Sequence, residues 1–366
     1  MKDQDCKSKN WFEQNPKRTT MFLILGFVLS VEAISQGCFF IQHRYFIFND
    51  PFKVRYIQEI HDEREYALKK NYHDARYRIN REGYRGAILQ GDPDILMLGD
   101  SVPFGSGAKE QETYPYILSN RYGLKVINGG VPSYSYRQSL LRWQKDFNGI
   151  HPKIVTVQAA NDTSLVMEYQ NEWKPGRTWL RKAWIPEISI FDYVFSNSAI
   201  YHYIKIFFAK NKSKTQAEFD QSKEESLNPE LENRFLNETA SEIDEIIRYS
   251  IATKAYLILI PVNPFYYMEP KDWEKNKKLH HWTKTYFQYF HSRTALYKKL
   301  NAILERKASQ YPHVFYFDII SEMDKGNRDL MYRDYIHHTA YGNSIFATQL
   351  FEFMKQKGLL DILKKT

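Results

Sequence analysis

The chain has 366 residues, of which 43% are hydrophobic and 26% charged, so it can bury a core and is not a disordered chain. Its two cysteines, Cys6 and Cys38, are too few for a disulfide framework or a four-thiolate zinc site within the chain. The net charge is +8, but the basic residues are scattered and form no compact tract beside an aromatic platform, which argues against nucleic acid as a partner.

The first pattern along the chain is an apolar run near the N-terminus. Residues Met21–Val31 read MFLILGFVLSV, and further apolar residues follow as far as Ile41, so the stretch approaches the length of about 20 residues that a spanning helix needs. Lysines and an arginine precede it, so the positive-inside rule makes residues 1–20 a cytoplasmic tail. We therefore expect a single-pass anchor at residues 21–42, with the globular part outside the cytoplasm (periplasmic in a bacterium).

Two features of this run leave an alternative open. Its purest apolar part is short enough for a cleaved signal peptide, although no Ala-x-Ala-like cleavage site follows it. Glu32 lies within the run, where a carboxylate is costly unless it reaches the interface, stays protonated or meets a partner helix. We favour an uncleaved anchor, and in both cases the globular part is exported.

The rest of the chain alternates between short apolar runs and helical patterns. Residues 43–90 are rich in Tyr, Arg and His and are interpreted as a membrane-proximal segment, followed by an α/β domain at residues 91–366. Continuous apolar strands indicate a parallel sheet covered on both faces, and their alternation with helices is typical of a doubly wound α/β sandwich. The predicted strands are Asp94–Gly99, Lys125–Asn128, Lys153–Gln158, Lys254–Ile260 and His313–Asp318, and the predicted helices are Tyr114–Tyr122, Tyr136–Asn148, Glu242–Thr253, Ser292–Gln310 and Gly342–Gln356.

An insertion at about residues 163–240 interrupts this alternation. Its first part is aromatic, and the polar tract from Ala209 to Arg234 is interpreted as a mobile loop or a short solvated helix. The aromatic part is interpreted as a lid or an insertion over the sheet. Its tryptophans could form a carbohydrate platform, although such residues more often pack an insertion onto its domain. These tryptophans are Trp173, Trp179 and Trp184.

Four polar blocks lie where open α/β sheets bind ligands, at the carboxyl ends of the strands or before the last helix. Each block has an ordinary structural interpretation by itself, but four blocks in this order at strand ends are hard to reach by chance. They are Gly99-Asp100-Ser101, Asn128–Ser133, Asn161-Asp162 and Asp334–His337.

In this order the blocks resemble those of the SGNH (GDSL-type) hydrolase and acyltransferase superfamily, and most closely its membrane-anchored, exported members, which include polysaccharide O-acetyl-modifying proteins. The similarity covers about residues 78–356, the insertion excepted, and it includes Asn80–Gly86, which is similar to an element that often precedes the serine block. The resemblance implies a flavodoxin-like three-layer sandwich, a Ser-His-Asp triad and an oxyanion hole. It implies no metal and no nucleotide cofactor.

The candidate catalytic residues are Ser101, His337 and Asp334. A serine hydroxyl becomes nucleophilic when a base takes its proton, and the base must itself be held by a third group. His337 is the candidate base and Asp334, three residues earlier, its orienting group. The family's glycine five residues past the histidine is Gly342, which selects His337 over His338. The alternatives are a plain N-cap for Ser101 and a surface loop or two-histidine metal site for the others.

An oxyanion formed on an ester carbonyl needs donors that already point at it. The candidate donors are the Ser101 backbone N–H, the Asn161 side-chain amide and a backbone N–H of the second block. For the last we take Ser133, with Gly130 as the alternative. The family has glycine where this chain has Ser133, which would strain the residue if that position needs a positive φ. Asn161 has an Asx-turn as its alternative interpretation, and Asp100 is interpreted as a turn or cap residue.

The sequence therefore predicts an exported, membrane-anchored serine esterase that works through an acyl-Ser101 intermediate on an acylated carbohydrate or another ester, such as a lipid. One alternative is an O-acyltransferase that modifies an envelope polysaccharide, with a separate membrane partner as acyl donor. The other is a catalytically silent SGNH-like binding domain. The choice between hydrolysis and transfer depends on whether water or a sugar hydroxyl accepts the acyl group, which stays open here.

Overall fold

The computed structural model describes residues 10–43, 46–47, 57–74, 76–160, 194–195, 197–212, 227–262, 290–324, 328–334 and 336–364. The chain divides into two compact units, Met1–Asp50 with Glu187–Gln216, and Pro51–Pro186 with Ala217–Thr366. The three insertion tryptophans, Trp173, Trp179 and Trp184, and the candidate oxyanion residue Asn161 lie outside the described residues.

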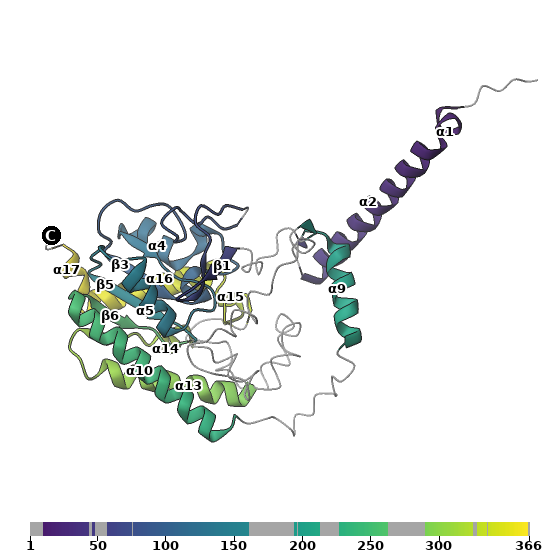
Figure 1. The fold of residues 1–366 in the computed structure, drawn as a ribbon. Coiled ribbons are helices and arrows are strands. Elements are labelled where there is room, and N and C mark those ends of the chain that lie inside the picture. Colours follow the sequence, from purple (N-terminus) through teal and green to yellow (C-terminus); the bar gives the residue numbers. More distant parts are fainter. Residues whose placement is uncertain are drawn as a thin grey trace, which may run out of the picture. The chain divides into compact units, whose positions relative to one another are not determined.

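The larger unit is built on a parallel sheet of five strands (Figure 1). The strands β3 and β5 are buried along their whole length, as expected of a sheet covered on both faces. All five predicted strands are confirmed, each slightly shorter than expected. In spatial order they are β4 (Val126–Asn128), β3 (Ile95–Gly99), β5 (Ile154–Gln158), β6 (Tyr256–Leu259) and β7 (Val314–Tyr316).

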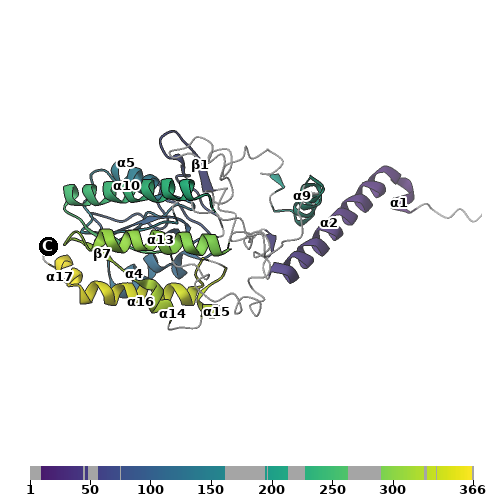
Figure 2. The same ribbon diagram turned by 90° about the horizontal axis from the view of Figure 1, so that it is seen from below.

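Helices cover both faces of this sheet, which makes three layers and confirms the predicted α/β/α sandwich. On one face α4 packs against α16, and on the other α10 packs against both α5 and α13 (Figure 2). The bounds are α4 (Tyr114–Tyr122), α5 (Tyr136–Lys145), α10 (Pro229–Thr253), α13 (Phe290–Ala308) and α16 (Ala340–Gln356).

Helix α10 begins earlier than the apolar periodicity predicts, at Pro229 in place of Glu242. The reason is local, because the Asn228 side chain accepts a hydrogen bond from the Glu230 N–H at 2.9 Å and so caps the helix, with proline in its first turn. The last residues of the polar tract, up to Arg234, are therefore the first turns of a long helix.

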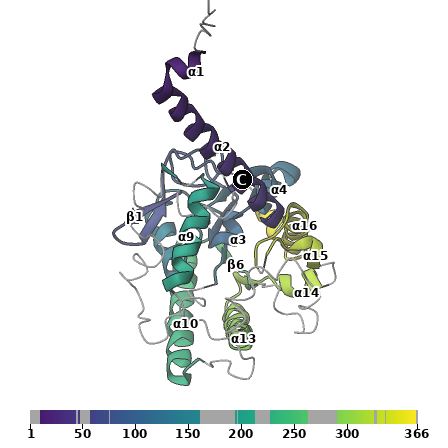
Figure 3. The same cartoon turned by 90° about the vertical axis from the view of Figure 1, so that its right-hand side faces the viewer.

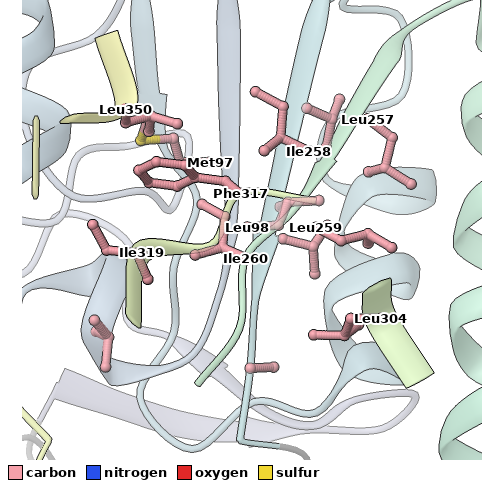
Figure 4. Close-up of a cluster of buried hydrophobic side chains, with 14 of the residues drawn as sticks. Met97, Leu98, Leu257, Ile258, Leu259, Ile260, Leu304, Phe317, Ile319 and Leu350 are labelled. Carbon is pink, nitrogen blue, oxygen red and sulfur yellow. The ribbon is translucent and has the colours of Figure 1, made fainter. Parts of the chain in front are cut away.

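The apolar core of this unit lies between the sheet and its helices. Figure 4 shows side chains of β3 and β6 together with Leu304 of α13, Leu350 of α16 and the neighbouring Phe317 and Ile319. Every side chain that it labels is buried. Because burial of each such side chain is worth about 1.5–3 kcal/mol, the core holds the strand ends as a fixed edge for polar groups.

Smaller elements complete the larger unit. An antiparallel hairpin of β1 (Gln58–His61) and β2 (Glu65–Leu68) lies within the segment interpreted from the sequence as membrane-proximal, and it belongs to the same unit as the sheet. Short helices α14 and α15 pack on α16 (Figure 3). The remaining bounds are α3 (Ser101–Phe104), the 3₁₀ helix η3 (Glu110–Glu112), α14 (Ile319–Asp324), α15 (Arg328–Met331) and α17 (Leu359–Leu363).

The described part of the smaller unit is mostly helical and rich in apolar residues. It contains α1 (Trp11–Gln14), α2 (Pro16–His43) and α9 (Ala199–Lys212), and the start of α9 packs against the C-terminal part of α2 (Figure 1). Within α2, residues Pro16–Ile41 are long enough to cross a membrane, and an 18-residue window of this helix has a mean hydropathy of 1.8. Length and composition therefore make α2 a candidate membrane span. A signal sequence near the N-terminus would meet the same two criteria.

Candidate active site

Ser101 lies where β3 ends, as the first residue of the short helix α3. Asp100 is the N-cap of that helix, the role predicted for it, and one of its carboxylate oxygens accepts the Val102 N–H at 2.9 Å. The other oxygen accepts the Ala160 N–H at 2.8 Å, just past the end of β5. A single buried side chain therefore fixes the start of α3 against the neighbouring strand end.

The Ser101 backbone N–H is available as a donor. It belongs to the first turn of α3, where N–H groups have no partner within the helix. Among the residues that the structure describes, no acceptor for this N–H is found. The geometry thus leaves one of the predicted oxyanion donors unoccupied beside the serine hydroxyl.

The Ser101 hydroxyl faces an imidazole from a distant part of the chain. His337 Nε2 lies 2.8 Å from Ser101 Oγ, although the two residues are 236 positions apart. On the other side of the ring, His337 Nδ1 lies 2.7 Å from Asp334 Oδ2. The structure therefore brings the three candidate catalytic residues into one hydrogen-bonded row.

Asp334 is itself held rigidly by the loop that carries it. Its Oδ1 accepts the backbone N–H groups of Ile336 at 2.9 Å and of His337 at 2.8 Å. With both oxygens engaged, the carboxylate cannot rotate without losing bonds inside a buried site. This arrangement fixes the imidazole in the tautomer whose Nδ1 carries the proton and whose Nε2 can accept one.

The charges in this row depend on one another. Burial by itself would raise the pKa of the Asp334 carboxyl, but the His337 charge and the hydrogen bonds to it lower that pKa. Burial would likewise lower the pKa of His337, but the Asp334 charge outweighs it and raises the pKa of the imidazole. Near the same site, burial raises the pKa of Asp100 to about 6. Asp334 thus stabilises the protonated imidazole that forms when His337 takes a proton.

The neighbouring His338 points elsewhere. Its ring packs against those of Tyr332 and Phe346, and burial lowers its pKa to about 4.

Gly342 is needed for close packing, because a Cβ there would lie 2.1 Å from the Met331 carbonyl oxygen. The alternative of a two-histidine metal site requires both rings to face one ion, whereas His337 directs its two nitrogens to Asp334 and Ser101.

In the second block, Gly130 serves packing. A Cβ at this position would lie 2.4 Å from the backbone nitrogen of Phe104, so only glycine lets the block approach α3. The Gly130 N–H also donates to Asn128 Oδ1 at 3.2 Å. This donor is therefore already engaged inside the protein.

Ser133 has the positive φ that, according to the sequence analysis, would strain a serine at this position. Its φ is +66°, in the left-handed region that favours glycine. The strain is held by the β1–β2 hairpin, because Tyr66 Oη donates to the Ser133 carbonyl at 2.7 Å and Gln58 Nε2 donates to the Pro132 carbonyl at 2.9 Å. No acceptor for the Ser133 N–H is found in the described part of the chain, so it is a freer donor than that of Gly130.

Arg85 supports the site, although the sequence analysis assigned it no role of its own. It appeared there only as part of Asn80–Gly86, the element that precedes the serine block. It is 3% exposed, and its guanidinium carbon lies 4.8 Å from the ring centre of Tyr77 and 4.9 Å from that of Phe104. It donates to three backbone carbonyls after Ser101, those of Phe104 at 2.8 Å, Gly105 at 2.7 Å and Ala108 at 2.7 Å. Burial lowers the pKa of Arg85 to about 10, so it stays charged at neutral pH. The Arg85 guanidinium, a planar fork of N–H donors, therefore holds the C-terminal end of α3.

Comparisons with known proteins give similarity at the level of fold. No family model and no curated protein matches the sequence. Similar solved structures include a GDSL-like lipase from Bacteroides thetaiotaomicron (13% identity, 72% of this chain and 87% of that chain, TM-score 0.39). They also include a catalytic mutant of an acetylxylan esterase from Geobacillus stearothermophilus (12%, 74% and 97%, 0.39) and a Pseudoalteromonas esterase inhibited by monoethylphosphonate (15%, 72% and 98%, 0.35).

These descriptions name one GDSL-like lipase and two esterases. At such identities and TM-scores, the role of each residue in this chain rests on its own contacts.

Proposed function

We propose that this chain is a serine esterase that cleaves an acyl ester through an acyl-Ser101 intermediate. The observation that carries the proposal is the pair of short contacts, 2.8 Å and 2.7 Å, from Ser101 Oγ to His337 and from His337 to Asp334. They supply an alcohol, a base in a fixed tautomer and a buried anion, which are the groups that acyl transfer through serine requires.

In the first half of the reaction, Ser101 Oγ bonds to the ester carbonyl carbon while its proton moves to His337 Nε2. The tetrahedral intermediate then collapses, and the alcohol leaves with the proton that His337 returns. In the second half, water loses a proton to His337 and attacks the acyl carbon. The acid leaves and the proton returns to Ser101, so the enzyme is regenerated.

The oxyanion of each tetrahedral intermediate would accept hydrogen bonds from the backbone N–H groups of Ser101 and Ser133. The support is that neither donor has an acceptor among the described residues, whereas the Gly130 N–H is engaged by Asn128. The Asn161 amide is the third proposed donor, since it directly follows Ala160, which Asp100 holds at the site.

We infer that α2 anchors this esterase in a membrane, with residues 1–20 on the cytoplasmic side and the larger unit outside. The length and hydropathy of α2 and the basic residues before it support this topology. An exported, anchored esterase meets the esters of the cell envelope. We therefore propose an O-acylated carbohydrate or lipid as its substrate.

The test is labelling of the full-length chain in detergent with a fluorophosphonate, followed by mass spectrometry. We expect one adduct on the peptide that contains Ser101 and none in Ser101→Ala. Ser106→Ala is the matched control, because Ser106 is a buried serine in the same loop whose Oγ has no hydrogen-bond partner among the described residues, and this variant should label like the wild type. Equal labelling of Ser101→Ala, or a folded wild type that does not label, would overturn the mechanism.

A second measurement separates hydrolysis from transfer. A chromogenic acetate ester is supplied with and without an oligosaccharide, and both free acetate and acetylated sugar are measured. Acetate as the main product in both cases supports the esterase. Sugar acetylation at the expense of acetate release would instead make the chain an O-acyltransferase that uses the same acyl-Ser101.

A further inference from the structure

Glu32, the one acidic residue of the apolar helix α2, is fully hydrogen-bonded by the chain itself. Gln36, one turn later, donates to Oε1 at 2.8 Å. The other donors all come from the start of α9, 166 to 168 positions away. They are Ser198 Oγ at 2.8 Å, the Ala199 N–H at 2.7 Å and the Ile200 N–H at 3.2 Å.

These contacts make Glu32 a cap for α9 that is supplied by another helix. The first N–H groups of a helix have no internal partner, and the helix dipole favours a negative charge at that end. A carboxylate in an apolar span is otherwise costly, and so are unpaired N–H groups at a helix start. Each group satisfies the other when Glu32 meets the start of α9. α9 spans Ala199–Lys212, long enough for both effects.

Gln36 extends the same polar stripe along α2. Its amide donates to the Asn197 carbonyl at 2.8 Å, and its oxygen accepts the Ile47 N–H at 3.2 Å. Beside this stripe, Phe39 is buried against Ile47, Ala199 and Tyr203. The contact between α2 and α9 is therefore a packed interface with polar groups satisfied at its centre (Figures 1 and 2).

Apolar side chains on the outer side of this pair are exposed. On α9, Ile204 is 47% and Phe207 62% exposed. On α2, Phe27 is 71% exposed, and Ile34 and Ile41 are exposed as well. The stretch AIYHYIKIFF at the start of α9 contains no acidic residue and one lysine, Lys205. Exposed apolar side chains beside a candidate membrane span have the chemistry of a lipid contact.

We propose that α9 is a second membrane-embedded element, which lies in the lipid against the C-terminal half of α2 and is held there by Glu32. The occupant of its outer surface is the hydrocarbon of the bilayer. This inference rests on the membrane anchorage proposed above for α2. It adds that the chain re-enters the membrane through the insertion, far along the sequence from its first helix.

The test uses spin labels on the full-length chain in vesicles of phosphatidylethanolamine and phosphatidylglycerol. Cys6 and Cys38 are first replaced by serine, and single cysteines are introduced as Ile204→Cys and Phe207→Cys. Phe27→Cys reports on the anchor alone, and Glu305→Cys, an exposed site on α13 in the other unit, reports on water. Collision with oxygen marks lipid, and collision with a water-soluble nickel chelate marks solvent.

We expect oxygen to be favoured at residues 27, 204 and 207, and nickel at residue 305. Nickel favoured at residues 204 and 207 while residue 27 favours oxygen would overturn the embedding of α9 and leave the anchor standing. Nickel favoured at residue 27 as well would overturn the anchor. Protection of residues 204 and 207 from both reagents would mean a protein partner on this surface, which also overturns the inference.

The capping role of Glu32 has its own readout. Two labels, at Phe27→Cys and Phe207→Cys, report the distance between α2 and α9 by pulsed electron paramagnetic resonance. Glu32→Leu should broaden the distance distribution several-fold, because the start of α9 loses its acceptor. Ile34→Ala, two residues away on an exposed face of α2, should leave it narrow. An unchanged distribution in Glu32→Leu would show that the cap does not hold α9.

Discussion

Asp334 and Glu32 occupy very different regions of the molecule, and each accepts two backbone N–H groups on its carboxylate. For Asp334 these are the N–H groups of Ile336 and His337, and for Glu32 they come from the start of α9. Their remaining partners differ. Asp334 meets the His337 imidazole, whereas Glu32 meets the hydroxyl and amide of Ser198 and Gln36.

This difference separates a chemical site from a structural one. An imidazole changes protonation near neutral pH, but a serine hydroxyl and a glutamine amide do not. The same kind of anchored carboxylate therefore controls a proton in one place and only holds a helix in the other. The side-chain partner of the carboxylate decides between these two roles, and its burial and its bonds to the backbone do not.

The largest expected effect comes from exchanging each carboxylate for its amide. Asp334→Asn should lower kcat by about 10⁴-fold, because an amide in that place neither fixes the reactive tautomer nor stabilises the protonated imidazole. Glu32→Gln should leave kcat for a water-soluble ester in detergent unchanged, since Glu32 lies in the other unit. Steady-state kinetics of both variants measure this contrast. A loss of similar size in both would refute the distinction.

The second prediction concerns pH. The raised pKa of His337 means that the neutral imidazole, which is the reactive base, forms only above its ordinary value of about 6.5. The kcat/KM of the wild type should therefore fall about tenfold per pH unit below a midpoint that lies above 6.5. In Asp334→Asn, burial acts without the opposing charge, so the residual activity should have its midpoint at a lower pH.

A pH–rate profile on one ester, run for the wild type and Asp334→Asn, checks this sign. A wild-type midpoint below 6.5 would contradict it. So would a midpoint that does not move when the charge is removed.

Arg85 contacts the chain just after Ser101, and its guanidinium keeps its positive charge at neutral pH, because its pKa is about 10. Arg85→Lys keeps the charge and loses the planar fork that binds the carbonyls of Phe104, Gly105 and Ala108. We expect kcat to fall about 10- to 100-fold with KM little changed and the pH midpoint unmoved, because only the position of Ser101 is affected.

Arg81→Lys, at an exposed ion pair with Glu82, is the control and should keep full activity. Equal activity of Arg85→Lys and Arg81→Lys would show that the fork does not position α3. A shifted pH midpoint in Arg85→Lys would point to an effect on His337 instead.

The parts of this comparison were not equally predictable from sequence. The strands were, because their apolar runs are local, and the order of the polar blocks indicated that Ser101 and His337 would face one another. The partner of Glu32 and the carbonyls held by Arg85 were not, since both depend on contacts between distant segments. The early start of α10 depends on one cap, Asn228, outside the periodic pattern.

The smallest expected effect is at Ser133, because a substitution there changes only the strain of the backbone and no charged or titrating group. Ser133→Gly should stabilise the protein by up to about 1 kcal/mol, because a φ of +66° costs serine more than glycine. Activity should be kept, since the backbone N–H remains. Ser135→Gly, two residues later, should destabilise by a few tenths of a kcal/mol, because Ser135 caps α5 with an ordinary φ.

Thermal melting of the two variants therefore gives shifts of opposite sign for the same chemical change. A large loss of activity in Ser133→Gly would mean that the serine side chain, and not the backbone donor, acts at the site. A shift of the same sign in both variants would mean that the hairpin contacts from Tyr66 and Gln58 have already removed the strain.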